Sequence, residues 1–177
     1  MNSPFLIQVA EGLVERGIAV VRFNFPDAEA GRSRPDPQPR LEACYRAVAT
    51  AVSEEVPKLF LGGKSMGGRI ASHIVADGYP AAGLILLGYP LHPPGKPERI
   101  RDAHQTRVNV PMLFSQGTRD TFAIPDLLHS TIASLPTATL VEIEGGDHSF
   151  KVPGRAPAEV MAHLIDTTVR FITEHAH

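Results

Sequence analysis

The sequence of 177 residues has little of several features that mark particular classes of protein. Its one cysteine, Cys44, excludes a disulfide within the chain and is compatible with a cytoplasmic location. Its 17 Lys and Arg residues against 19 Asp and Glu residues form no basic stripe of the kind that binds nucleic acid. No apolar run reaches the ~20 residues that a membrane span needs, and the N-terminus does not resemble a signal peptide.

The length predicts a single domain over residues 1–177 with one sizeable core. Short, nearly continuous apolar runs are typical of buried strands, and they occur at 18–25, 58–62, 83–88, 112–116 and 139–143. Apolar residues at helical spacing lie between them, at 4–16, 41–52, 66–76, 126–135 and 157–174. We expect loops at 27–39 and 89–107. This alternation predicts an α/β fold, with a doubly wound, mostly parallel sheet and helices on both faces.

The most informative stretch is residues 59–70, where a strand pattern enters a Gly-rich turn and a helical pattern leaves it. Gly63-Lys64-Ser65-Met66-Gly67 fits G-x-S-x-G, the pattern of a nucleophile elbow. Small residues are needed where strand and helix approach each other, and such a turn lifts the serine hydroxyl above the sheet edge. The amide of Met66 would then point at an oxyanion forming beside Ser65.

A Gly-rich turn between a strand and a helix is also compatible with structures other than a nucleophile elbow. Such a loop without chemistry occurs in many α/β domains. A phosphate-binding P-loop requires a glycine five residues before Gly63, where this chain has Lys58. The dinucleotide fingerprint G-x-G-x-x-G does not fit these glycines either. A nucleotide-binding domain is therefore excluded by its own motifs, and the elbow requires an acid and a histidine elsewhere in the chain.

Candidates for both partners follow the last two predicted strands. Asp120 follows the strand at 112–116, and His148 follows the strand at 139–143. Chemistry in parallel sheets gathers at the carboxyl ends of strands, so Ser65, Asp120 and His148 should meet there. Their order along the chain is the order of nucleophile, acid and histidine in α/β-hydrolases. Asp147 is a weaker rival acid, because it adjoins the histidine and would have to bend back toward it.

Five strings carry a closer resemblance, and they extend over nearly the whole chain: RFNFP (22–26), GGKSMGGR (62–69), LGYPLHPPGKPE (87–98), QGTRD (116–120) and GDHSF (146–150). They resemble a group of small, lidless, dienelactone-hydrolase-like proteins within the α/β-hydrolase superfamily. That group includes bacterial predicted hydrolases and the hydrolase-like domain of a subunit of the nonspecific-lethal chromatin complex. The resemblance implies that Ser65 is the nucleophile, Asp120 the acid and His148 the base.

The chain departs from that family at its beginning. Members of the related group have a strand and a His-Gly-type loop directly before a Ser-Pro-Phe helix start, and the loop donates a second oxyanion amide. Here Ser3-Pro4-Phe5 is present, but the strand and loop are absent. The family's strand order would place that strand between 18–25 and 58–62. We therefore expect the natural start to lie upstream of Met1; a natural short form would need those two strands to pair directly, or another chain between them.

The sequence thus predicts a serine hydrolase that cleaves a small ester or thioester through an acyl-enzyme intermediate. The alternative is a catalytically weak or silent hydrolase-like binding module, favoured by the missing oxyanion loop. Lys64 and His92 are candidates for the substrate pocket, although a solvated loop lysine is the simpler interpretation of Lys64. The histidines show no metal-ligand spacing, so neither metal nor cofactor is predicted. The predicted partner is the small substrate, without nucleic acid or membrane, and a homodimer is left open.

Overall fold

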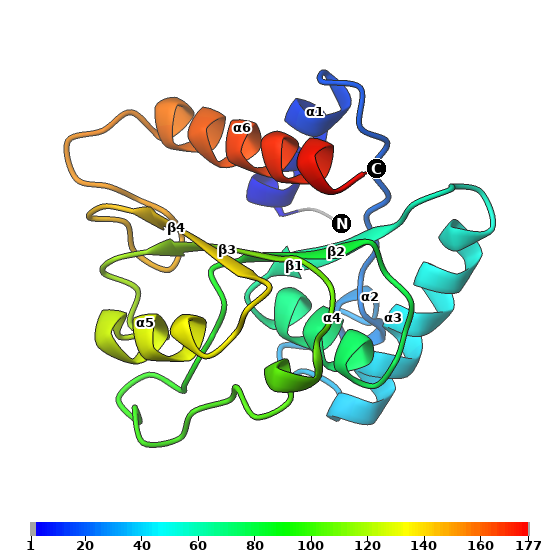
Figure 1. The fold of residues 1–177 in the computed structure, drawn as a ribbon, viewed down its shortest axis with the longest axis horizontal. Helices are drawn as coiled ribbons and strands as arrows, with labels where there is room; N and C mark the ends of the chain where they lie inside the picture. The colour runs from blue at the N-terminus through cyan, green and yellow to red at the C-terminus, as the bar shows by residue number, and fades with distance from the viewer. Residues whose placement is uncertain (1–2, 177) are drawn as a thin grey trace.

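The computed structural model describes residues 3–176, and its centre is a parallel sheet of four strands (Figure 1). The strands are β1 (Phe60–Lys64), β2 (Gly83–Leu87), β3 (Met112–Gly117) and β4 (Ala138–Ile143). They lie side by side in the order of the chain, β1-β2-β3-β4. A connection between neighbouring parallel strands must cross a face of the sheet, and such crossovers are right-handed as a rule. The predicted α/β class with a parallel sheet is confirmed.

Helices cover both faces of this sheet (Figure 1). On one face lie α1 (Pro4–Val14) and α6 (Pro157–His175), which contact each other. On the other lie α2 (Pro26–Glu29), α3 (Gln38–Ser53), α4 (Met66–Ala76) and α5 (Pro125–Ala133), with a 3₁₀ turn at Gln105–Arg107. The interval 27–39, expected to be a loop, thus contains most of α2 and the start of α3.

Two apolar clusters, one on each face, hold the layers together. The larger lies between the sheet and the α3–α4 side, and Ile70, Ile74 and Leu84 are completely buried in it. The smaller joins α1 and α6 to the sheet through residues such as Leu13, Leu87 and Leu164. Because β2 contributes to both clusters, its side chains are apolar on both faces, which explains its unbroken apolar sequence.

The prediction of a strand over 18–25 is wrong, since this segment forms no strand in the described part of the chain. A strand requires a neighbour that exchanges backbone hydrogen bonds, and β1 ends the sheet on this side with no described strand beyond it. The apolar side chains of the segment pack nevertheless. Phe23 and Phe25 contact Tyr45 of α3, and Ile18 and Val20 pack against the α1–α6 cluster. Direct pairing of 18–25 with β1, expected of a short form, is not observed either.

A side chain occupies the outer edge of β1 at its centre. The Gly62 amide donates a hydrogen bond of 2.9 Å to the Tyr45 hydroxyl, which in turn donates one of 2.6 Å to the Gly62 carbonyl oxygen. Tyr45 is 5% exposed, and burial raises its pKa to about 12, so the hydroxyl keeps its proton. One hydroxyl therefore satisfies both polar groups that a neighbouring strand would otherwise satisfy at this residue.

We expect Tyr45→Phe to lower the free energy of unfolding by about 1–3 kcal/mol, because it leaves the Gly62 amide and carbonyl without partners. Urea unfolding followed by circular dichroism measures the change. Tyr79→Phe is the matched control, since the Tyr79 hydroxyl has only a 3.4 Å exposed contact with Thr50. Equal, small losses in both variants would show that the Tyr45 bridge contributes nothing particular.

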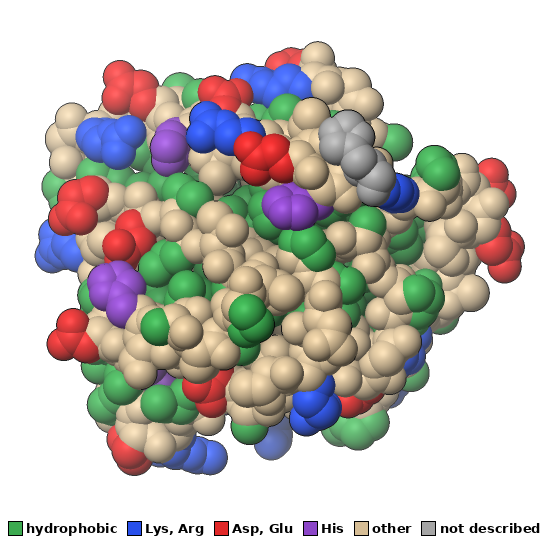
Figure 2. Space-filling model, in the orientation of Figure 1, with side chains coloured by type: hydrophobic (Ala, Val, Ile, Leu, Met, Phe, Trp, Pro, Cys, Tyr) green, Lys and Arg blue, Asp and Glu red, His purple; other side chains and the backbone are tan. Residues whose placement is uncertain are grey.

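Charged side chains of both signs are interspersed over the face shown in Figure 2, with apolar atoms between them. This distribution agrees with the nearly neutral composition. Within residues 3–176, no helix combines the length and apolar character needed to cross a membrane. No group of three or more His, Cys, Asp or Glu side chains in that range is arranged to hold a metal ion.

Candidate active site

Ser65 lies at the apex of the turn between β1 and α4, as the elbow pattern predicts. Its backbone has φ 51° and ψ −116°, a conformation that non-glycine residues rarely adopt. Two hydrogen bonds hold it there: the Ser65 amide donates to the Leu87 carbonyl at 2.9 Å, and the Arg69 amide donates to the Ser65 carbonyl at 3.1 Å. The surrounding sheet and helix therefore compensate for the strain and keep the hydroxyl at the end of the strand.

The glycines around Ser65 contribute unequally to this turn. A Cβ atom on Gly63 would lie 2.8 Å from the backbone of Gly67 and Gly68, and one on Gly68 would lie 2.7 Å from the Gly63 carbonyl oxygen. Gly67, the last residue of the G-x-S-x-G pattern, has open space around it. The close approach of strand and helix therefore depends on Gly63 and Gly68, the second of which lies just outside the motif.

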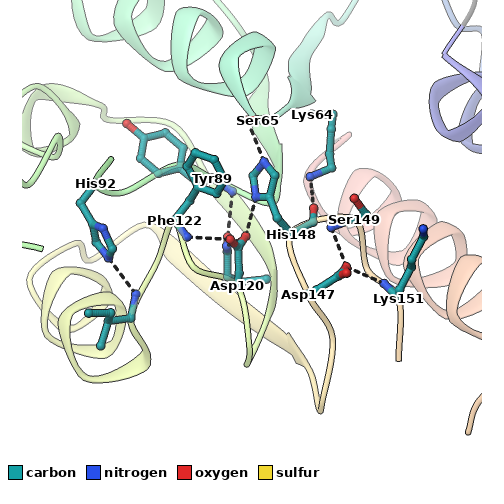
Figure 3. Close-up of polar contacts among 12 residues, drawn as sticks. Lys64, Ser65, Tyr89, His92, Asp120, Phe122, Asp147, His148, Ser149 and Lys151 are labelled. Carbon is teal, nitrogen blue, oxygen red and sulfur yellow. Dashed lines mark hydrogen bonds and ion pairs between the residues drawn. The ribbon is translucent and has the colours of Figure 1, made fainter. Parts of the chain in front are cut away.

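Ser65, His148 and Asp120 form one hydrogen-bonded chain (Figure 3). His148 Nε2 lies 3.0 Å from Ser65 Oγ, and His148 Nδ1 lies 2.7 Å from Asp120 Oδ2. The Asp120 carboxylate accepts a hydrogen bond from Nδ1 of His148, so Nδ1 carries the proton of the neutral ring. Nε2 is then an acceptor, and it faces the Ser65 hydroxyl. The three residues follow β1, β3 and β4, whose carboxyl ends lie on the same edge of the sheet.

Two further residues hold Asp120, and neither is identified by the sequence patterns. Gln116 donates from Nε2 to Asp120 Oδ2 at 2.6 Å, and its Oε1 accepts the Tyr89 amide at 2.7 Å. The Phe122 amide donates to Asp120 Oδ1 at 2.8 Å. Asp120 is 3% exposed, so these donors replace water around the carboxylate. Gln116 is even less exposed than Asp120 and lies four residues before it. A polar residue at the end of an apolar strand is the signal that could have found it.

Asp147, the rival acid, has a different set of partners. Its Oδ1 accepts the Ser149 amide at 2.8 Å and the Lys151 amide at 2.9 Å, whereas the ring of His148 is bonded to Asp120. The bonds of Asp147 close the turn that carries His148 (Figure 3). Asp147 therefore shapes the loop, whereas Asp120 contacts the imidazole.

His92, a candidate pocket residue, is 1% exposed and bonded at both ring nitrogens. Its Nε2 accepts the Ile124 amide at 3.1 Å, which leaves Nδ1 to donate to the Pro93 carbonyl at 2.9 Å. Its own amide donates to the Phe122 carbonyl at 3.0 Å. His92 thus supports the turn that follows Asp120, and neither ring nitrogen is left for a substrate.

Lys64 differs from the solvated loop lysine that the sequence suggests. It is the last residue of β1 and is half-buried, and its ammonium donates a hydrogen bond to the His148 carbonyl oxygen (Figure 3). The ammonium also lies 5.0 Å from the centre of the Phe150 ring and 6.0 Å from that of Phe5. Burial lowers the pKa of Lys64 to about 8.

A second serine–histidine contact lies on α4, away from Ser65. Ser72 Oγ is 2.7 Å from His104 Nε2, but Ser72 is completely buried and His104 is 6% exposed. Burial lowers the pKa of His104 to about 3, and among the described residues no carboxylate forms a hydrogen bond with its ring. The contact therefore holds the 89–107 segment against α4, and a substrate cannot reach it.

Ser65 and its base are partly accessible to solvent. Ser65 and His148 are both half-buried, and the Phe122 ring packs against the imidazole with 4.3 Å between ring centres. One hollow is lined by residues 31–37. A second is lined by Arg119, Gly145, Asp147 and residues 151–153, and neither includes Ser65. Met66 is the first residue of α4, so its amide has no acceptor within the helix. The expected loop before Met1 lies outside the described residues.

A serine in a strained turn between a parallel strand and a helix, with its hydroxyl at the carboxyl edge of the sheet, is the arrangement of α/β hydrolases. The family model described as an alpha/beta hydrolase domain matches residues 1–176, and the chain therefore belongs to that family.

Solved structures with the same fold support this assignment. A serine hydrolase homologue from Coxiella burnetii is 22% identical with a TM-score of 0.75, over 96% of this chain and 76% of that one. A serine hydrolase without a lid from Xanthomonas campestris is 24% identical with a TM-score of 0.73, over 98% and 74%. Dienelactone hydrolase from Anabaena variabilis is 18% identical with a TM-score of 0.75, over 98% and 80%. The resemblance to lidless, dienelactone-hydrolase-like proteins is confirmed.

Proposed function

We propose that this protein is a serine hydrolase that cleaves a small ester or thioester through an acyl-enzyme intermediate. The observation that carries the proposal is the chain of two hydrogen bonds from Ser65 through His148 to Asp120, at 3.0 and 2.7 Å. A nucleophile and base within hydrogen-bond reach, with the base oriented by a third group, is the arrangement that nucleophilic catalysis requires. Membership of the α/β hydrolase family supports the same chemistry.

In the proposed reaction Ser65 Oγ attacks the acyl carbon while His148 Nε2 takes the hydroxyl proton. Asp120 stabilises the resulting imidazolium, and the Met66 amide donates to the oxyanion. The tetrahedral species collapses with cleavage of the bond to the leaving group, which receives the proton from His148. Water then attacks the acyl-serine with His148 again as base, and release of the acid restores Ser65.

The partial exposure of Ser65 and His148 is compatible with a small substrate whose acyl carbon reaches Ser65 from solvent. Within the described residues, the Phe122 ring beside the imidazole offers the apolar surface next to the reacting atoms. Both esters and thioesters are compatible with the mechanism, because it requires only an acyl carbon and a leaving group that His148 can protonate.

The test is reaction of the folded protein with a fluorophosphonate, followed by intact-mass and peptide-mapping mass spectrometry. We expect one adduct, on Ser65, because attack on phosphorus uses the same hydroxyl and the same base. A silent binding module, the alternative function, predicts a folded protein without an adduct. An adduct on a different serine would also contradict the assignment of Ser65.

A further inference from the structure

The residue before the candidate nucleophile makes a contact that the proposed mechanism does not use. Lys64 donates from its ammonium to the main-chain carbonyl oxygen of His148, 84 residues further along the chain. Lys64 precedes Ser65 directly, so one residue connects the strand that carries the nucleophile to the loop that carries the base. In Figure 3 the Lys64 side chain runs from the end of β1 down to this carbonyl.

Two aromatic rings and a glycine lie around the Lys64 ammonium. The rings of Phe5 and Phe150 stack on each other with 5.6 Å between their centres, and both lie within cation–π range of Nζ. Gly88 follows β2 with φ +61°, and a Cβ there would lie 2.6 Å from Lys64 Nζ. Phe150 itself has a φ of 61°, unusual for an aromatic residue. The ammonium thus lies beside two aromatic rings and the backbone of Gly88.

Placing the Lys64 ammonium in this space costs desolvation free energy. Removal from water penalises the charged form, which is why the pKa of Lys64 falls from 10.5 to about 8. An apolar side chain of similar length, such as methionine, would pack against the same two rings without that penalty. Stability alone therefore does not explain a lysine at this position, whereas a bond to the His148 main chain does.

The His148 loop is otherwise held by its own bonds and by bonds to the segment after β3, where the Arg119 amide donates to the Gly146 carbonyl and Thr118 Oγ1 accepts the Gly145 amide, both at 2.8 Å. Asp147 accepts the amides of Ser149 and Lys151, and the Phe150 amide donates to the Asp147 carbonyl at 2.9 Å. These bonds fix the shape of the loop and its place beside β3, and none of them comes from β1. Lys64 lies in β1 and bonds to the loop at His148, the residue whose ring must face Ser65.

We propose that Lys64 is a positioning residue, whose ammonium anchors the His148 main chain to the end of β1 and so sets the imidazole against Ser65. The proposal rests on the proposed hydrolase function and adds to it a residue that acts through His148. A misplacement of about 1 Å in a catalytic group can cost about a hundredfold in rate. We therefore expect Lys64→Met to slow reaction with the fluorophosphonate about ten- to a hundredfold without loss of fold.

The proposal includes a dependence on alkaline pH. Among residues 3–176, the charged groups that act on the ammonium are the carboxylates of Asp120 and Asp147, and the residue whose carbonyl it binds carries the imidazole of His148. Phe5 of α1 and Gly88 after β2 are uncharged. Above pH ~8 Lys64 loses its proton, and the bond to the His148 carbonyl loses its charge assistance. Reactivity should fall there, by less than in Lys64→Met, because the neutral amine still donates.

A loss of stability caused by the titration of Lys64 cannot explain this fall in reactivity. Between pH ~8 and 10.5 the unfolded chain keeps the Lys64 proton and the folded chain does not. The unfolded state then binds more protons, so the Lys64 contribution to stability rises with pH across this window. A loss of reactivity with constant or rising stability is thus the expected signature.

The experiment compares wild type, Lys64→Met, Lys64→Arg and Lys151→Met. Lys151→Met is the matched control, because the exposed Lys151 belongs to the same loop and joins its hydrogen bonds through its main chain. Arginine keeps a charged donor at all these pH values. We expect Lys64→Arg to recover most of the labelling rate and to lack the alkaline fall, and Lys151→Met to match wild type in both respects.

Nuclear magnetic resonance of ¹⁵N-histidine-labelled protein supplies a readout independent of catalysis. The Nδ1 proton of His148, shared with Asp120, should shift in Lys64→Met and, in wild type, as Lys64 titrates above pH ~8. An unchanged resonance in Lys64→Met, or in wild type if that variant does not fold, would overturn the proposal. A shifted resonance in a protein that ignores the fluorophosphonate would leave the positioning role standing and refute the hydrolase function instead.

Discussion

Ser65→Ala is expected to abolish the fluorophosphonate adduct and to lower the turnover of an ester such as p-nitrophenyl acetate at least about a thousandfold. The substitution removes the hydroxyl oxygen that lies 3.0 Å from His148 Nε2. Without it the base has no nucleophile to activate, although the oxyanion donors and the binding surface are unchanged. Mass spectrometry and initial rates measure both effects.

Ser149→Ala is the control for this prediction. Ser149 is exposed, adjoins His148 and participates in the loop through its amide, which alanine keeps. We expect its adduct and turnover to equal those of wild type. Undiminished turnover in Ser65→Ala would mean that the hydrolysis has another origin, and the nucleophile would have to be sought elsewhere.

Asp120→Asn is expected to lower turnover by about 10⁴-fold while leaving the fold intact. The carboxylate oxygen 2.7 Å from His148 Nδ1 holds the ring in the tautomer whose Nε2 accepts the serine proton. An amide nitrogen in its place donates to Nδ1, which puts the ring proton on Nε2 and removes the base. The oxygen of the new side-chain amide would still accept the Phe122 amide, but its nitrogen would face the Gln116 Nε2 donor, so we expect a lower thermal midpoint in a protein that still folds.

Asp147→Asn separates the two candidate acids. Asparagine keeps an oxygen that accepts the Ser149 and Lys151 amides, so the loop retains its shape. Turnover within about threefold of wild type is expected, because Asp147 does not hold the imidazole proton. The reverse pattern, with a large loss in Asp147→Asn and a small one in Asp120→Asn, would transfer the acid's role to Asp147.

Most of the helices and strands could be predicted from local patterns because their periodicity is strong. The last helix, expected at 157–174, is found at Pro157–His175, and the strand expected at 83–88 is found at Gly83–Leu87. Ser3 caps the first helix, accepting the Leu6 amide at 3.4 Å. The segment 18–25 is the exception among the predicted strands. Its composition is that of a strand, but composition cannot supply the neighbour that a strand needs.

The residues of the candidate site also differ in whether the sequence could identify them. Ser65, Asp120 and His148 could be identified because each follows an apolar run, and strand ends meet at one edge of a parallel sheet. Phe122 and the bond from Lys64 could not, since each depends on contacts between residues of different or folded-back segments. Gln116 is marked in the sequence only as a polar residue at the end of an apolar strand, which does not reveal its bond to Asp120. His92, expected near a substrate, instead supports the Asp120 turn.

The sequence by itself determined the α/β class, the order of elements and the residue types at each strand end, because these follow from hydrophobic period, turn residues and chain order. Only the tertiary structure decided which acid contacts His148, that Ser72 and His104 are closed off from solvent, and that the half-buried Lys64 binds the main chain of His148. Those outcomes depend on distances of a few ångströms between residues far apart in the chain. No pattern along the sequence contains them, because packing of the whole sheet and both helix layers sets them.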